Sequence, residues 1–345
     1  MRLRPGLRVL RRGESEVQIG TDPRWAALLT GLSPLEADLL QLLDAEPDLE
    51  ILGARAQACG LPAARVADIL GALEAARLTC RTTRRAGPAI RASATADAVA
   101  WSLLRDDGAG AAVVRARADR TVGIVGLGRL GLTVAVTLAA AGVGAVLLDD
   151  DDLVTSVDVG ASGYRMSDVG CARRIAATRV LRDVTPEIRI EPARGYAPDI
   201  VVLVERDVAD PATALALVNV GMTHLSVVLR EADALVGPLV VPGAGACLRC
   251  VDLHHGDVDP GWPTVAAQLV SRAATAAPVG GEVGVLAGVC GALAAAEVLI
   301  YLDGGSPATR SASYEVALPD VVPRRRSWVV HPYCGCNALT RSSPG

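Results

Sequence analysis

The chain has 345 residues, of which 51% are hydrophobic, and a formal net charge of −4. It is long enough to form two domains with cores of their own, and it lacks the overall positive charge that nucleic-acid binding requires. It contains no lysine, which excludes a P-loop lysine and a Schiff-base lysine.

The N-terminal residues lack the apolar core of a signal peptide. The longest apolar helix candidate, Val283–Leu302, contains Glu297 and many Gly and Ala residues, so we expect a buried packing helix and no membrane span. We therefore expect a cytoplasmic protein. In that reducing compartment the eight cysteines should be thiols or metal ligands.

Residues 1–80 are predicted to form a small module, a hairpin followed by three helices. The hairpin comprises residues 7–10 and 16–20, and the helices run from Pro34 to about Ala45, over 49–58 and over 62–77. Ser33 and Glu36 form a capping box that starts the first helix. This order predicts a winged-helix-like domain. Its third helix carries only two arginines, too few to hold a DNA backbone, so we expect no nucleic-acid partner.

Residues 81–118 are predicted to be an arginine-rich, solvated linker with one short helix over 97–104. Residues 119–345 are predicted to form an α/β domain with a mostly parallel sheet. After the segment described next, its expected elements are a helix over 167–183, a strand over 188–192, a strand over 199–204, a helix over 211–221, a strand over 224–229 and a further strand over 237–242.

The run Thr121–Gly131 is the most informative stretch of the chain. Thr121–Val125 is apolar without alternation, as in a strand buried on both faces. Gly126, Gly128 and Gly131 then form G-x-G-x-x-G, a turn that lets backbone approach a phosphate and lets the next helix, over 132–141, pack on the strand. A second strand, 145–148, leads to Asp149, at about the interval at which a carboxylate meets a ribose. This is the pattern of a Rossmann-like nucleotide-binding unit.

Two short cysteine pairs lie far apart in the α/β domain, at Cys247/Cys250 and Cys334/Cys336, each expected in a turn. Two thiolate pairs of this kind can complete a tetrahedral four-sulfur zinc site. We expect a structural zinc that fixes the C-terminus to the domain. The alternative, a redox C-x-x-C, is disfavoured because we do not expect Cys247 to open a helix after a strand.

Together these motifs resemble the ThiF/MoeB/ubiquitin-activating (E1-like) superfamily over about residues 119–338. The resemblance rests on the glycine turn, the aspartates, Asp168-Val169-Gly170 and the two cysteine pairs. It implies an E1/ThiF fold, a tetracysteine zinc, a homodimer, and adenylation with ATP and magnesium of the C-terminal carboxylate of a small carrier protein.

The family stretch D-x-D-x-V-x-x-S-N-L-x-R-Q is only partly kept. The resemblance places Asp149, Asp151 and Ser156 on it, but Gly160 stands where a phosphate-binding arginine is expected, and Arg173 stands where a later lysine is expected. It also places a magnesium ligand at Asp207. Adenylation needs cations on the triphosphate, so the site looks partly dismantled. Arg129, inside the glycine turn, can replace the missing arginine, or it can simply be solvated.

The stretches around the cysteines also resemble E1-like proteins of thiazole/oxazole-modified peptide (TOMM, RiPP) pathways, known as cyclodehydratase or leader-peptide-binding proteins. In them the E1-like domain commonly activates nothing and a YcaO-type partner uses the ATP. Their small N-terminal element, similar to PqqD, binds a leader peptide as an added strand, and residues 1–80 have its order of elements.

Two main hypotheses follow. In the first, the chain is a weakly or non-catalytic scaffold that binds a precursor peptide and a YcaO-type enzyme. In the second, it is an active adenylyltransferase. The nucleotide-binding candidates are Gly126, Gly128, Arg129, Gly131, Asp149, Asp151, Ser156, Arg173 and Asp207, of which Arg173 and Asp207 are the catalytic candidates. An NAD(P)-linked oxidoreductase is a weaker third possibility, because no hydride-side catalytic group can be named.

Overall fold

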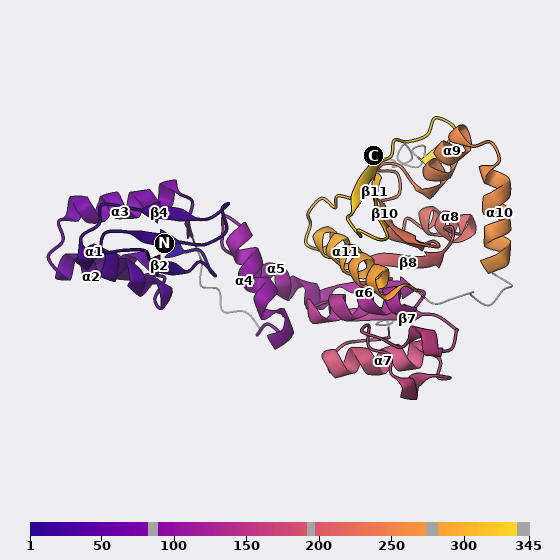
Figure 1. The fold of residues 1–345 in the computed structure, drawn as a ribbon, viewed down its shortest axis with the longest axis horizontal. Helices are drawn as coiled ribbons and strands as arrows, with labels where there is room; N and C mark the ends of the chain where they lie inside the picture. Colours follow the sequence, from indigo (N-terminus) through magenta and orange to yellow (C-terminus); the bar gives the residue numbers. More distant parts are fainter. Residues whose placement is uncertain (82–88, 192–196, 274–281, 337–345) are drawn as a thin grey trace, which may run out of the picture. The chain divides into compact units, whose positions relative to one another are not determined.

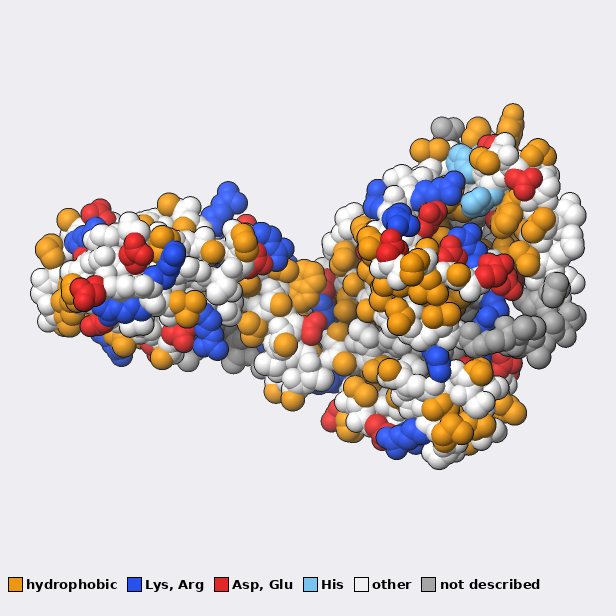
Figure 2. Space-filling view, in the orientation of Figure 1, with side chains coloured by type: hydrophobic (Ala, Val, Ile, Leu, Met, Phe, Trp, Pro, Cys, Tyr) orange, Lys and Arg blue, Asp and Glu red, His pale blue; other side chains and the backbone are white. Residues whose placement is uncertain are grey.

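The structure is a computed structural model that describes residues 1–81, 89–191, 197–273 and 282–336 (Figure 1). The chain divides into two compact units, Met1–Arg115 and Ala116–Gly345. On the face seen in Figure 2, arginine side chains stand beside acidic ones in both units.

The first unit is built around a three-stranded antiparallel sheet in the order β2-β3-β4. The strands of this unit are β1 (Arg2–Leu3), β2 (Val9–Arg11), β3 (Val17–Ile19), β4 (Ala27–Leu29) and β5 (Thr79–Cys80), and its first helices are α1 (Pro34–Gln41), α2 (Leu49–Ala58) and α3 (Ala63–Ala75). The expected hairpin and three helices are therefore present, and β4 adds a third strand. The expected capping box also forms, since Glu36 N–H donates to Ser33 Oγ at 3.3 Å and Ser33 N–H donates to Glu36 Oε2 at 2.6 Å.

Two further helices, α4 (Thr95–Leu104) and α5 (Gly110–Ala116), follow the first 80 residues. Buried Arg4 holds the end of α4 in place. Its guanidinium donates to Leu103 O at 2.9 Å and pairs with Asp106 at 2.8 Å, while its Nε donates to Arg77 O at 2.7 Å. One arginine thus ties together three segments that are distant in sequence within this unit.

The second unit contains a seven-stranded sheet in the order β12-β11-β10-β9-β8-β6-β7. Its strands are β6 (Thr121–Val125), β7 (Ala145–Asp149), β8 (Ile200–Arg206), β9 (His224–Leu229), β10 (Asp233–Val240), β11 (Ala312–Ala317) and β12 (Arg324–Ser327). The larger part, β7-β6-β8-β9, is parallel, and β10 to β12 extend it in antiparallel register. This is the expected α/β Rossmann-like arrangement.

The strand order reverses between β6 and β8, because the chain moves from β6 to β7 in one direction and from β8 to β9 in the other. Right-handed crossovers on the two sides of such a reversal place the connecting helices, α6 (Arg129–Ala140) and α8 (Pro211–Asn219), on opposite faces of the sheet. In open sheets of this kind, ligands bind at the carboxyl ends of the strands beside such a reversal. The expected glycine turn directly follows β6.

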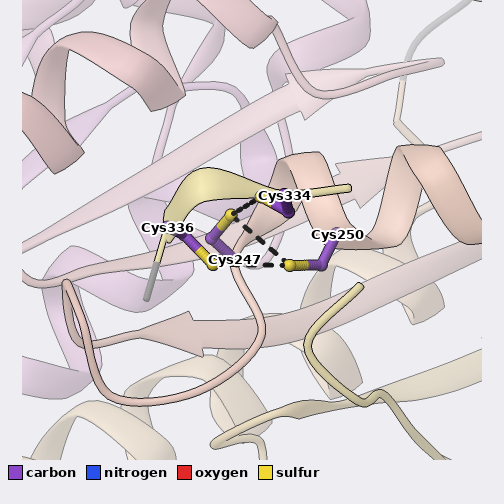
Figure 3. A group of neighbouring side chains, drawn as sticks. All are labelled: Cys247, Cys250, Cys334 and Cys336. Atoms are coloured by element: carbon purple, nitrogen blue, oxygen red, sulfur yellow. Dashed lines mark hydrogen bonds between the residues drawn. The ribbon is translucent and has the colours of Figure 1, made fainter. Parts of the chain in front are cut away.

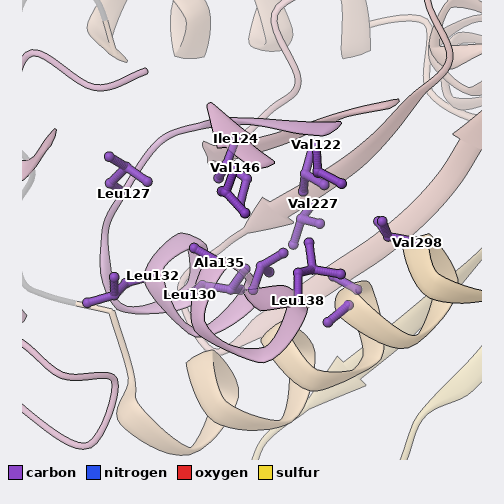
Figure 4. Close-up of a cluster of buried hydrophobic side chains, with 14 of the residues drawn as sticks. Val122, Ile124, Leu127, Leu130, Leu132, Ala135, Leu138, Val146, Val227 and Val298 are labelled. Carbon is purple, nitrogen blue, oxygen red and sulfur yellow. The ribbon is translucent and has the colours of Figure 1, made fainter. Parts of the chain in front are cut away.

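The core of this unit lies between the sheet and two helices, α6 and α11 (Gly284–Leu302), as Figure 4 shows. Gly291 allows their close approach, since a Cβ there would stand 2.7 Å from Thr133. By length and composition alone, α11 is the one helix among the described residues that could cross a membrane, yet 56% of its apolar window is buried. It is a packing helix, as expected from its Gly and Ala content.

Several expected boundaries were wrong, among them the start of helix α6, which lies at Arg129 and not at the expected residue 132. Helix α7 (Arg173–Val184) begins six residues after the expected Ser167, because Gly170 has φ +89° and interrupts helical backbone. The expected strand at 188–192 is reduced to one bridge between Arg189 and Ala145, and residue 192 lies outside the described residues. Strand β10 begins at Asp233, four residues before the expected Gly237, because it pairs with both β9 and β11.

Candidate nucleotide site and four-cysteine cluster

Two of the three glycines of the turn after β6, Gly126 and Gly131, are required by close contacts with backbone atoms. Gly126 has φ +85°, and a Cβ there would lie 2.3 Å from Val204 O. A Cβ on Gly131 would lie 1.9 Å from Gly126 O, so helix and strand pack as tightly as the motif predicts. Gly128 is the N-cap of α6, which leaves the first backbone N–H groups of the helix pointing at the turn.

The four aspartates after β7 have different positions. Asp149 ends the strand and is exposed, as is Asp151. Asp150 instead holds the glycine turn, because its Oδ2 accepts a hydrogen bond from Leu127 N–H at 2.6 Å. Asp149 is thus free to meet a ligand, and Asp150 has a structural role that the sequence did not predict. Ser156 lies exposed in a short helical turn further along.

Arg129 fills the space that Gly160 leaves open. A Cβ on Gly160 would stand 3.4 to 3.6 Å from the guanidinium atoms of Arg129. The guanidinium donates to Val159 O and, at 3.1 Å, to Glu282 O. An arginine from the first turn of α6 therefore lies beside Gly160, the position at which the family resemblance led us to expect an arginine. Of the two interpretations of Arg129, a solvated surface side chain is wrong, since it is half-buried and bonded.

Arg173 is held by carboxylates. It lies 3.3 Å from Asp150 and Asp152 and 3.1 Å from Asp158. Burial lowers the pKa of Arg173, but Asp150 and Asp158 outweigh burial and raise that pKa above its ordinary value. Its Nε has no hydrogen-bond partner among the described residues. Arg173 is therefore positively charged and lies beside the glycine turn, but its guanidinium is already paired with three carboxylates.

The end of β8 brings further charged groups to the same edge of the sheet. Asp207 directly follows the strand with φ +67°, and its N–H donates to Leu229 O at 2.7 Å. Burial raises the pKa of Glu205 to about 7. Arg206 is half-buried and interacts electrostatically with Glu282. Arg206 and Glu282 could not be recognised in the sequence, because both come near the glycine turn only when distant segments of the chain meet.

The four predicted cysteines do come together, as Figure 3 shows. Their sulfur atoms are separated by 3.9 Å (Cys247 to Cys250), 3.6 Å (Cys247 to Cys334) and 3.5 Å (Cys250 to Cys336), and all four lie within 4.8 Å of one another. Four sulfurs bound tetrahedrally to zinc at their usual bond length would be about 3.8 Å apart. The cluster therefore has the dimensions of a four-sulfur metal site.

The placement of the first cysteine pair differs from the sequence prediction. Cys247 is the N-cap of α9 (Leu248–Val258) and Cys250 lies in its first turn, so the pair opens a helix after strand β10. The expectation that Cys247 does not open a helix after a strand was therefore wrong. What disfavours a redox role is the presence of Cys334 and Cys336 within sulfur contact of that pair.

Residues 98–326 match the model of the ThiF family. This is more than half of the chain, which therefore belongs to the ThiF family, as the glycine and cysteine motifs had suggested. A comparison with curated protein sequences finds no significant match.

Several solved structures share the fold across nearly the whole chain. E. coli MccB with ATP is similar over 97% of this chain and 98% of its own, at 16% identity and a TM-score of 0.67. The microcin C7 biosynthetic enzyme MccB in complex with N-formylated MccA gives the same coverage and identity and a TM-score of 0.68. PaaA matches 94% of this chain and 99% of its own, at 14% identity and a TM-score of 0.67.

Proposed function

We propose that this protein is a peptide-modifying, ATP-dependent adenylyltransferase of the ThiF family. The observation that carries the proposal is the guanidinium of Arg129 in the space beside Gly160. It returns a fixed positive charge to a glycine turn that the sequence alone suggested had lost one. Preorganised positive charge around the phosphates is what adenylation requires of a protein.

Different residues around the glycine turn bind different parts of Mg-ATP. Backbone N–H groups at the start of α6 and the side chain of Arg129 bind phosphate oxygens. Exposed Asp149 accepts hydrogen bonds from the ribose, and Asp207 binds magnesium. A peptide carboxylate oxygen then attacks the α-phosphorus, a new P–O bond forms, and pyrophosphate leaves with the electron pair of the broken bond. Arg173 and Arg206 add positive charge at the same sheet edge.

The substrate we propose is a precursor peptide. Among the MccB structures similar to this chain, one is of MccB with ATP and another is of MccB with N-formylated MccA, and the likeness of both spans the two units of this chain. In the first unit, β4 is an edge strand of the three-stranded sheet, with exposed Leu28. An extended peptide can pair with such an edge through main-chain hydrogen bonds. We propose that this winged-helix-like unit binds the leader part of the peptide, while a small carrier protein is the alternative substrate.

The cysteine cluster is proposed to bind one structural zinc. The sulfur separations of 3.5 to 3.9 Å support this proposal, because they bracket the value for a tetrahedral zinc site. When bound, zinc would supply cross-linking and no chemistry, since four protein sulfurs leave no open position. It would join the start of α9 to the segment that follows β12.

The second candidate remains a scaffold that binds the peptide and leaves ATP chemistry to a YcaO-type partner. It is favoured by one observation, the sharing of Arg173 among three carboxylates, which leaves that cation poorly available to a phosphate.

Peptide-dependent exchange of labelled pyrophosphate into ATP separates the two candidates. The purified chain is incubated with Mg-ATP and short peptides encoded beside its gene. Exchange that requires the peptide supports adenylation. If the peptide binds but neither exchange nor ATP binding is detected, the adenylation proposal is wrong and the scaffold is favoured.

A further inference from the structure

The phosphate side of the glycine turn is already in contact with an acidic group of the same chain. Glu282, which immediately precedes the N-cap of α11, accepts a hydrogen bond from Leu130 N–H through its Oε2 at 2.6 Å. A Cβ added to Gly128 would lie only 2.0 Å from Oε1 of the same carboxylate. The carboxylate therefore rests directly on the backbone that the absence of a side chain at Gly128 leaves open.

Both ends of Glu282 are held by the first turn of α6. Its side chain takes the Leu130 N–H, and its main-chain oxygen accepts from Arg129 Nη1 at 3.1 Å. An anion at a helix N-terminus is stabilised by the free N–H groups and the helix dipole. These are the same groups that would receive a nucleotide phosphate.

Both positively and negatively charged side chains lie near Glu282. Arg206 and Arg173 attract the carboxylate, and Asp158 repels it. Burial raises the pKa of Glu282 above its ordinary value. The Leu130 N–H and the two arginines therefore offset only part of the cost of burying this carboxylate. A ligand with more negative charge and more acceptor oxygens than one carboxylate can displace it.

We propose that Glu282 is an internal competitor for the phosphate subsite, which must leave the glycine turn before a polyphosphate ligand binds. This inference rests on the proposed function for the identity of the ligand. It makes Glu282 a residue that sets nucleotide affinity and favours triphosphates over ligands with a single anionic group. The apparent dissociation constant is then raised by the fraction of molecules in which the subsite is filled.

The test compares the full-length wild type with Glu282→Ala and Glu282→Gln by calorimetric titration with Mg-ATP and, separately, with inorganic tripolyphosphate. We expect both ligands to bind at least about tenfold more tightly to Glu282→Ala. Glu282→Gln should also bind more tightly, because it keeps the size of the side chain but removes its charge. Glu187→Ala, at an exposed position on the same unit, should match the wild type.

Equal affinity in the wild type and both Glu282 variants, or weaker binding by the variants, overturns the inference. Unchanged thermal melting of Glu282→Gln guards against loss of folding as the cause. If the variants bind both ligands tightly but show no peptide-dependent pyrophosphate exchange, the inference holds and the proposed function fails. If no form of the protein binds either ligand, both are overturned.

Discussion

The cysteine cluster and the glycine turn lie in the same unit but depend on their surroundings in different ways. The cluster consists of four residues of one type, whose sulfur atoms all lie within 4.8 Å of one another. The glycine turn gains its charge from side chains that are distant in sequence. Glu282 bonds to a backbone N–H that lies 152 residues earlier in the chain. Residue type was thus enough to predict that four thiols cluster, whereas the charges around the glycine turn depend on which side chains the fold brings together.

The largest effect is expected when the cysteine cluster is broken. Cys250→Ser should lose the bound zinc and destabilise the second unit by several kcal/mol, since binding of a structural metal contributes to folding free energy. The measurements are zinc per chain by elemental analysis and the melting temperature. Cys171→Ser, at an exposed cysteine outside the cluster, is the control and should change neither. Purified, reduced protein that contains no zinc and melts like Cys250→Ser would contradict the metal proposal.

The next effect concerns the arginine that fills the space beside Gly160. Arg129→Ala should lower the rate of peptide-dependent pyrophosphate exchange about 100-fold, the cost of removing one preorganised charge from a transition state. Arg182→Ala, at an exposed position in the last turn of α7, is the control and should leave the rate unchanged.

A second substitution sharpens this prediction. Adding Gly160→Arg to Arg129→Ala should restore part of the rate, because it returns a guanidinium to the same space from the other side. In the wild type the same Gly160→Arg should be harmful, because it would bring a second guanidinium next to that of Arg129, which lies 3.4 Å from the position of the new Cβ, and like charges repel. If the rates of Arg129→Ala and the double variant were identical, a guanidinium in this space would not be what supports pyrophosphate exchange.

Glu205 should make the stability of the second unit depend on pH. Its pKa is about 7 in the folded protein, against 4.5 as its ordinary value. The neutral form is favoured in the native state, so stability is full below about pH 4.5 and is lost as the pH rises through about 7. Between pH 5 and 8, we expect the wild type to lose about 2 to 3 kcal/mol relative to Glu205→Gln. Denaturant unfolding at both pH values measures this difference, and parallel pH dependence of the two proteins would contradict it.

The smallest expected effect is a difference in stability between substitutions at two neighbouring aspartates. Asp150→Ala should lower the unfolding free energy by about 1 to 3 kcal/mol, because it leaves the Leu127 N–H without its acceptor. Asp149→Ala should leave stability within about 0.5 kcal/mol but weaken ATP binding, because the side chain is exposed at the end of β7. Chemical denaturation and ATP titration of both variants test the assignment, which is reversed if Asp149→Ala is the less stable protein.

Much of the site could be predicted because local geometry dictates certain residues. Gly126 and Gly131 are needed where backbone atoms approach too closely for a side chain. Glycines required in this way recur at fixed spacing, so the G-x-G-x-x-G motif can be recognised in the sequence. The same is true of Ser33 and Glu36, which start a helix by bonding only to each other's backbone. Four cysteines in two short pairs could also be recognised without a fold.

Other features could not be predicted because they arise from contacts between distant segments. Periodicity extended α7 through Gly170, whose left-handed backbone ends any helix there. The alternation around Arg189 suggested a strand, yet only one bridge forms at the edge of β7. Arg129 was a candidate from its place in the turn, but its role depends on the fold bringing Gly160 beside it. Glu282 carried no signal in the sequence at all.

A crystal structure of the protein with magnesium and a non-hydrolysable ATP analogue would show whether the glycine turn, Arg129 and the start of α6 hold the phosphates of a nucleotide. We expect phosphate oxygens on the N–H groups at the start of α6, Arg129 within hydrogen-bond distance of them, and the Glu282 carboxylate moved off Leu130. A nucleotide bound elsewhere, or one whose phosphates avoid Arg129 while Glu282 stays in place, would contradict this expectation.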